Sequence, residues 1–356
     1  MKIKNKWSER WKKGVRGLKQ IELRKFMEQE KPKKKYKQEW SAYNLSQTQE
    51  FSMFQDILIE LIDQLIDVRN PVFKKGRPFA NFKEMIFCCV MKSYFDKSSR
   101  RSTSYLAWAK GKNYITKIPH FNTILKYYKN PNMTLSLKHL IEKSGLPLKE
   151  IEKDFTVDGS GFSTSLYGRW FSVRLGKNSW RRLFRKAHVC SGVKTNIITS
   201  VETSQGYYND SPFFEDLVKA TRKNFEMREI SADAAYSSRN HMEMVSGLGA
   251  VPYIMFRSNS SGRAKGSLTW SRMFRFFKQH REEFLDHYHK RSNAESVFNM
   301  IKRKMGTHLY CRTETAQNNE LLCKCLAHNI CVLIAETFEA NAWLDYENSE
   351  KLIVRN

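Results

Sequence analysis

Apolar residues recur at every third or fourth position through the first part of the chain, which predicts a series of helices. Residues 49–68 follow this spacing, and their apolar positions are Phe51, Phe54, Ile57, Leu58, Leu61 and Leu65. Residues 80–95 predict a second, largely buried helix, and further helices are expected at 121–130 and 135–152. The N-terminal part is therefore expected to be all-helical.

The pattern changes near residue 154. Short segments rich in β-branched and aromatic residues at 154–166, 169–175 and 186–204 predict three strands of an antiparallel meander. Pro212 then marks the start of a helix that runs to about Phe225.

The remaining segments alternate between the two periodicities. Strands are expected at 227–233 and 250–256, with a short helix at 237–247 between them. From about residue 270 the chain is expected to be helical, apart from a break near Gly306. This order predicts an α/β (α+β) fold in which a mixed sheet is flanked by helices and preceded by a helical domain.

The charge of the chain indicates its partner. Its 356 residues include 62 Lys and Arg against 36 Asp and Glu, a formal net charge of +26. Such an excess favours a polyanion, with nucleic acid as the first candidate. An anionic membrane surface is a weaker alternative, because the charge is spread along the chain and no apolar run of about 18 residues predicts a membrane span.

The cellular compartment can be inferred from the cysteine content and from the N-terminal residues. Seven Cys, of which only Cys88 and Cys89 are adjacent, do not suggest a disulfide framework. The first residues are charged and show no secretory signal. We therefore expect a reducing, cytoplasmic location in association with the nucleoid, and no membrane partner.

Four segments are expected. Residues 1–45 form a basic arm, either solvated and partly disordered or in contact with DNA phosphates; within residues 1–40, fifteen Lys and Arg face five Glu. Residues 46–150 form a helical domain. This domain either binds DNA, for which a helix-turn-helix is one arrangement, or is an ordinary helical subdomain that reads no bases. Residues 151–340 form the catalytic domain, and residues 341–356 form a C-terminal tail.

Three acidic residues are candidates for catalysis. Asp158 lies in the first strand, Asp233 ends a later strand, and Glu295 lies in a predicted helix. Converging carboxylates repel one another unless cations neutralise them, and Mg²⁺ prefers oxygen ligands. Two such ions can promote in-line displacement at a phosphodiester. The alternative for each Asp is an ordinary turn residue.

The predicted helix at 288–304 has a mixed polar stripe. At about 100° per residue, Tyr288, Arg291, Glu295 and Lys302 share one narrow face, next to an apolar face suited to burial. A solvated charged face is the ordinary interpretation. Phosphate handling explains the mixture better, because Arg binds phosphate through two parallel hydrogen bonds and Lys adds a point charge.

The same residues carry a family resemblance. The spacing Tyr288-x2-Arg291-x3-Glu295-x6-Lys302 resembles the YREK signature of DDE transposases from bacterial and archaeal insertion sequences. The segments VDGSGF (157–162) and ADAAYSS (232–238) are similar to the two Asp segments of that family, and residues 194–212 resemble the stretch between them. The resemblance covers roughly residues 150–340, and residues 76–87 together with 98–102 are more weakly similar to the helical N-terminal region of the same group.

The resemblance implies a ribonuclease H-like core in which Asp158, Asp233 and Glu295 hold two Mg²⁺ or Mn²⁺ ions per active site. Tyr288, Arg291 and Lys302 would bind DNA phosphate beside the cut. It further implies binding of an element's terminal inverted repeats, cleavage at its ends and joining of the 3′-hydroxyl ends to target DNA. A homodimer or larger assembly on paired ends is implied as well.

Hairpin formation at the ends has less support in the sequence. The stretch between Asp233 and Glu295 is too short for the β-strand insertion of some relatives, so an aromatic that stacks a flipped base would need another source, such as Trp270. Two other functions remain open: a catalytically inactive, domesticated DNA-binding protein, and a ribonuclease H-like structure-selective nuclease.

Other groups are weaker candidates. One group of possible zinc ligands consists of Cys311, Cys323, Cys325 and His328. These residues either bind zinc or belong to a buried core helix, and the core helix is favoured. His188 is expected to be a packed rather than a catalytic residue. Trp170, Trp180, the basic run 180–186 and the loop Arg263–Lys265 are DNA contacts or solvated loops.

Overall fold

The structure is a computed structural model that describes residues 39–65, 80–164, 174 and 184–339, together with the backbone of 342–343 and 353–354. Predictions for the basic arm up to residue 38, for the strand at 169–175 except Arg174, and for Trp170 and Trp180 lie outside the described residues. The described residues from Ser41 onward form one compact unit.

The N-terminal part is helical, as predicted. Its helices are α3 (Trp40–Asp63), α4 (Phe82–Tyr94), α5 (Ser99–Gly111), α6 (Phe121–Tyr128) and α7 (Pro131–Gly145). Local signals set the ends: the Asn81 side chain accepts hydrogen bonds from two backbone N–H groups at the start of α4, and Pro131 opens α7. Helix α3 begins nine residues before the predicted start, inside the segment assigned to the basic arm.

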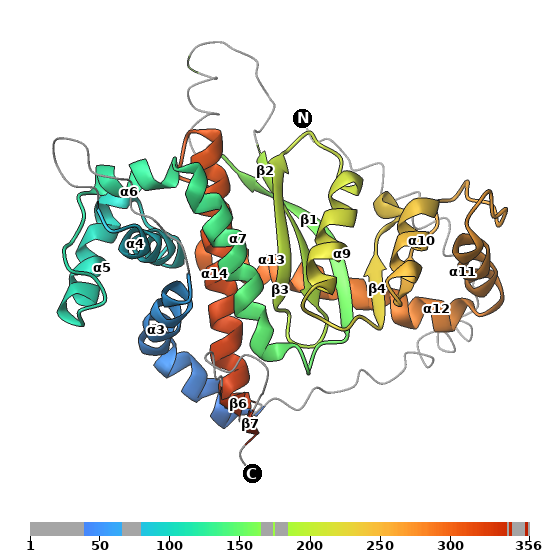
Figure 1. Ribbon diagram of the computed structural model, residues 1–356, viewed down its shortest axis with the longest axis horizontal. Coiled ribbons are helices and arrows are strands. Elements are labelled where there is room, and N and C mark those ends of the chain that lie inside the picture. The colour runs from blue at the N-terminus through green and yellow to red at the C-terminus, as the bar shows by residue number, and fades with distance from the viewer. Residues whose placement is uncertain are drawn as a thin grey trace, which may run out of the picture. The chain divides into compact units, whose positions relative to one another are not determined.

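A five-stranded mixed sheet follows (Figure 1). Its strands are β1 (Asp154–Ser163), β2 (Phe184–Gly192), β3 (Ile198–Gln205), β4 (Glu229–Ala232) and β5 (Val251–Ile254). The order is β3-β2-β1-β4-β5; β1, β2 and β3 are antiparallel, whereas β4 pairs parallel with both β1 and β5. This topology confirms the predicted ribonuclease H-like mixed sheet.

One strand prediction was wrong. Residues 186–204 do not form a single strand, because the chain reverses between β2 and β3 and Asn196 adopts a positive φ of 65° there. Asn tolerates this backbone region better than most residues, so it allows the tight reversal. The polar residues Lys194 to Asn196 mark the turn within an otherwise β-rich run.

Helices cover both faces of the sheet. After β3 the chain forms α9 (Phe214–Arg222), α10 (Arg239–Gly247), α11 (Leu268–Gln279), α12 (Arg281–Tyr288), α13 (Ser292–Met305) and α14 (Glu314–Glu339). Alternation along β1 separates two apolar clusters: Phe155 and Val157 pack with α9 and α10, whereas Phe162 packs with α13 and α14. Asp158 shares the parity of Phe162, which directs its side chain toward α13.

Helix α14 is a central core element that runs beside α7 (Figure 1). By length and composition it could cross a membrane, and 72% of its most apolar window is buried within the protein. Its inner residues join the same apolar cluster as α4, α6 and α7. The helical part and the sheet therefore share one hydrophobic core along α14.

Candidate active site

Asp158 lies in the middle of the central strand β1 with its side chain 18% exposed. The backbone N–H of Gly159 donates to Asp158 Oδ1 at 2.8 Å. Burial raises the pKa of Asp158 to about 6, although the Gly159 N–H and Arg291 act in the opposite direction. Repulsion from Asp233 and Glu295 adds to the increase in the pKa of Asp158, so both acids lie close enough to act on it.

Asp233 is placed beside Asp158 by the register of the sheet. Val157 of β1 lies opposite Ala232 of β4 in a parallel ladder, and each Asp is the next residue of its strand. Neighbouring strands lie about 4.8 Å apart, and residues in register project to the same face. Asp233 Oδ1 accepts a hydrogen bond of 2.7 Å from the N–H of Ala235, which fixes the carboxylate as the cap of the short 3₁₀-helix Ala234–Tyr236.

Glu295 and Arg291 reach the same site from the other side. Glu295 lies in the first turn of α13, and its carboxylate is 60% exposed. Arg291 Nη2 donates to Glu295 Oε1 at 2.7 Å, while Arg291 Nη1 lies 3.7 Å from Asp158 Oδ2. One guanidinium group thus lies between the strand Asp and the helix Glu and compensates both charges.

Tyr288 is the last residue of α12 and does not share a continuous helix with Glu295. A 3₁₀ turn at His289–Arg291 separates α12 from α13, so the single predicted helix at 288–304 was wrong. The tyrosine ring nevertheless faces the site, because the Arg291 guanidinium carbon lies 6.0 Å from its centroid. The turn consists of His289, Lys290 and Arg291.

Lys302 lies two turns further along α13. Its ammonium group donates to Ser160 Oγ at 2.7 Å and lies 5.2 Å from the ring centroid of Phe162. Burial lowers the pKa of Lys302. Since Ser160 has the same parity as Asp158 on β1, the lysine contacts the same face of the strand, one pleat beyond the acid. Ser160 was missed in the sequence, where its place between Gly159 and Gly161 was the only signal.

The donor set is suited to a hard cation. Asp158, Asp233 and Glu295 offer only carboxylate oxygens, the ligands that Mg²⁺ and Mn²⁺ prefer. Within the described residues no three His, Cys, Asp or Glu side chains lie close enough together to hold an ion. The exposed Glu295 side chain is the one that can change rotamer and approach the two strand acids.

A second polar cluster lies behind β1, on the face of Gly159. His188 is fully buried, its Nε2 lies 2.8 Å from Ser204 Oγ, and burial lowers its pKa to about 4. Asp210 accepts from Lys186 at 2.9 Å and lies 3.5 Å from His188 Nδ1. The prediction that His188 is a packed residue is confirmed. Asp210 was missed, because its Asp-Ser-Pro context indicated only a helix start.

The sulfur-containing candidates belong to the core, as the favoured interpretation predicted. Cys311, Cys323 and Cys325 are buried among apolar side chains. His328 Nε2 lies 3.0 Å from the carbonyl oxygen of Asn196, and burial lowers the pKa of His328 to about 4. No part of the described chain gathers three such ligands.

Trp270 and the loop at 263–265 also make contacts within the protein. The Trp270 ring is buried, its Nε1 donates to Ser261 at 2.8 Å, and the Arg239 guanidinium lies 4.5 Å from the ring centroid. The carbonyls of Arg263 and Ala264 accept hydrogen bonds from Arg239. An aromatic that stacks a flipped base is therefore not provided by Trp270 in this arrangement.

Fold and site together define a ribonuclease H-like α/β protein with an acidic site at the end of the parallel ladder between β1 and β4, beside α13. The sequence profile of the transposase DDE domain family matches residues 152–330, half of the chain. The chain belongs to this family. No curated protein sequence matches it.

Among solved structures, the chain is similar to the cryo-EM structure of a piggyBac transposase synaptic complex with hairpin DNA. The two share 11% sequence identity and a TM-score of 0.36 over 82% of this chain and 81% of the other.

Proposed function

We propose that the chain is a metal-dependent DNA transposase of the YREK group from an insertion sequence. One observation carries the proposal: the parallel register sets Asp158 beside Asp233 where the ladder between β1 and β4 ends, and Arg291 links Asp158 to Glu295. A protein that only bound DNA would gain nothing from carboxylates facing phosphate.

Asp158, Asp233 and Glu295 would hold two Mg²⁺ or Mn²⁺ ions. Bound there, the ions would activate a nucleophile and stabilise the leaving oxygen of a phosphodiester. Other residues of the chain would orient the acids and position the phosphate. The backbone N–H of Gly159 would orient the carboxylate of Asp158.

Three basic and hydroxyl groups would position the scissile phosphate. Arg291 can exchange its contacts with Asp158 and Glu295 for a bidentate contact with phosphate once cations compensate the acids. Lys302, held by Ser160, supplies a point charge next to the acids. Tyr288, whose ring lies near Arg291, would offer a hydroxyl donor.

The substrate would be duplex DNA. The chain would bind the terminal inverted repeats of its element through the helical part within 46–150, cut at the element ends and join the 3′-hydroxyl ends to target DNA. It would act as a homodimer or larger assembly on paired ends, in contact with the nucleoid. The net charge of +26 supports a polyanionic partner.

The test is cleavage of oligonucleotide duplexes that end in the inverted repeats flanking the coding sequence, with and without Mg²⁺. Asp158→Asn removes one charge without changing shape, so cleavage is expected to disappear while duplex binding persists. Asp216→Asn, on the exposed face of α9, is the matched control and should cleave like the wild type. Cleavage retained by Asp158→Asn would contradict the proposal.

The same assay separates the alternatives. A domesticated DNA-binding protein would bind the ends and cleave nothing with either metal. A structure-selective nuclease would cut, but would yield no products in which the 3′-hydroxyl is joined to a second duplex.

A further inference from the structure

The segment from Lys97 to Ile141 is basic throughout. Its 45 residues include nine Lys or Arg and no Asp or Glu. The basic residues are Lys97, Arg100, Arg101, Lys110, Lys112, Lys117, Lys126, Lys129 and Lys138. All but Lys97, which lies just before α5, are on or between α5, α6 and α7, so a local positive surface follows from sequence and fold together.

Helix α5 concentrates this charge on one face. Its buried residues are Ser99, Ser102, Leu106 and Ala109, which at about 100° per residue span an arc of about 80°. The opposite arc of about 140° holds the residues that we call the α5 outer face: Arg100, Arg101, Ser104, Tyr105 and Trp108. Each of these five is exposed, with Tyr105 at 44% and Trp108 at 55%.

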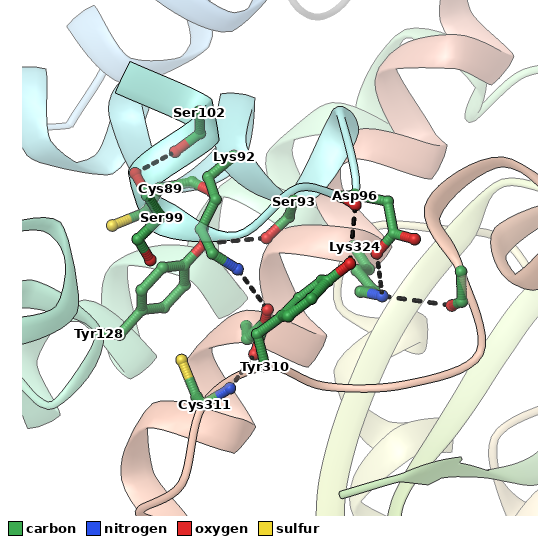
Figure 2. Close-up of polar contacts among 12 residues, drawn as sticks. Cys89, Lys92, Ser93, Asp96, Ser99, Ser102, Tyr128, Tyr310, Cys311 and Lys324 are labelled. Atoms are coloured by element: carbon green, nitrogen blue, oxygen red, sulfur yellow. Dashed lines mark hydrogen bonds and ion pairs between the residues drawn. The ribbon is translucent and has the colours of Figure 1, made fainter. Parts of the chain in front are cut away.

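The inner face explains how α5 is seated. Small Ser99 and Ser102 let the helix lie close to its neighbours, and Ser102 Oγ donates back to the carbonyl of Ser99 at 3.0 Å (Figure 2). On the outer side, Arg100 lies 4.9 Å from the ring centroid of Phe121 in α6, and Tyr105 stacks on Phe95 at 4.5 Å. These contacts hold outer-face side chains in defined positions without burying them.

The start of α5 is attached to the catalytic part. Asp96, three residues before α5, accepts from Tyr310 through its carbonyl at 3.0 Å and pairs with Lys324 at 3.4 Å (Figure 2). Lys324 also donates to the carbonyl of Gly306, at the end of α13, at 3.2 Å. The start of α5 is therefore connected to the end of the Glu295 helix through partly buried polar contacts.

We propose that the α5 outer face docks into the major groove of duplex DNA and is the element that contacts the ends in the transposase proposed above, on whose function this inference rests. The helix is about 20 Å long, and the groove is about 12 Å wide and accepts an α-helix. Two adjacent arginines suit phosphates and guanine edges, and Ser104 and Tyr105 add hydroxyl donors. Of the Trp, Phe and Leu side chains with which an interfacial helix enters a membrane, the outer face carries only Trp108, beside two arginines.

The test uses the full chain, a fluorescent duplex of mixed sequence and EDTA, so that binding is measured without catalysis. Arg101→Ala is expected to weaken binding roughly tenfold and to reduce the salt dependence of log K by about 0.9. Lys223→Ala, which removes one exposed charge beyond α9, should bind like the wild type. Ser104→Asp adds a negative charge to the same face and should weaken binding further.

Circular dichroism and the thermal midpoint identify any variant that fails to fold, and Arg101→Gln, which removes the charge but keeps a long polar side chain, then replaces Arg101→Ala. Unchanged duplex binding by both Arg101→Ala and Ser104→Asp overturns the inference. If α5 variants lose binding but the wild type never cleaves with Mg²⁺, the docking surface stands and the proposed function fails. If cleavage is normal and α5 variants bind normally, only the docking surface fails.

Discussion

Asp158 and Asp233 occupy the positions directly after Val157 and Ala232, the last residue pair of the parallel ladder between β1 and β4. Each Asp also accepts a nearby backbone N–H through its Oδ1, from Gly159 and Ala235 respectively. Local hydrogen bonds thus orient both carboxylates before any ligand arrives, and Asp158 Oδ2 is left facing Arg291.

The cap formed by Asp233 gives a prediction that separates structure from chemistry. Asn caps helices as well as Asp does, so Asp233→Asn should retain the stability of the wild type and abolish Mg²⁺-dependent cleavage. Asp233→Ala should also lose about 1 kcal/mol of unfolding free energy, because the N–H of Ala235 loses its acceptor. Urea denaturation and the cleavage assay measure the two effects. Equal stability of the Asn and Ala variants would contradict the assigned cap.

Much of this site could be predicted from the sequence, because local patterns determined it. Strand periodicity placed Asp158, and motif spacing associated Arg291 with Glu295 one turn away. The break between Tyr288 and α13 could not be foreseen, since His289, Lys290 and Arg291 all fit a helix. The contact of Lys302 with Ser160 depends on how α13 crosses β1, which no local pattern encodes.

The contacts between α4 and α14 could not be predicted from the sequence either. Lys92 and Glu320 lie 228 positions apart, and both read as ordinary charged positions in amphipathic helices. Both side chains are buried, with their charged atoms 2.5 Å apart. Burial opposes both charges, yet their mutual attraction prevails, so the pKa of Glu320 is lowered and that of Lys92 is raised.

This buried pair predicts strong coupling between two substitutions. Lys92→Met should cost about 3–5 kcal/mol of unfolding free energy, because it leaves the Glu320 carboxylate uncompensated in the core. Glu320→Gln should be similarly costly, since it strands the ammonium group of Lys92. The double variant should cost less than the sum, as Gln can still accept from the N–H of Cys311. A double-mutant cycle by chemical denaturation measures the coupling, and additive costs would refute it.

Gly306, which ends α13, is expected to tolerate no side chain. Its φ of 78° and ψ of 159° lie in a region that is essentially restricted to glycine. An added Cβ would also collide with the carboxylate of Asp96. Gly249 is the matched control, because its φ is 85° but no heavy atom lies within 4 Å of an added Cβ.

We expect Gly306→Ala to lose about 1–3 kcal/mol more unfolding free energy than Gly249→Ala, since only the former adds an atomic overlap to the backbone strain. Thermal and urea denaturation of both variants measure the difference. A larger loss for Gly249→Ala would show that Asp96 is not held against the end of α13.

Glu336, near the end of α14, predicts how stability depends on pH. Burial raises its pKa to about 7, and the neighbouring carboxylates of Glu339 and Glu152 add to the increase. Because the folded chain keeps this proton more tightly than the unfolded chain, the contribution is fully present below the ordinary value of 4.5 and is lost as pH rises through 7. As pH rises from about 5 to about 8, the unfolding free energy of Glu336→Gln should therefore increase by roughly 1–2 kcal/mol relative to that of the wild type. Urea denaturation at both pH values measures this gain, with the exposed Glu282→Gln as a control whose difference from the wild type should not change. A gain that is larger at the lower pH would reverse the sign and exclude a raised pKa.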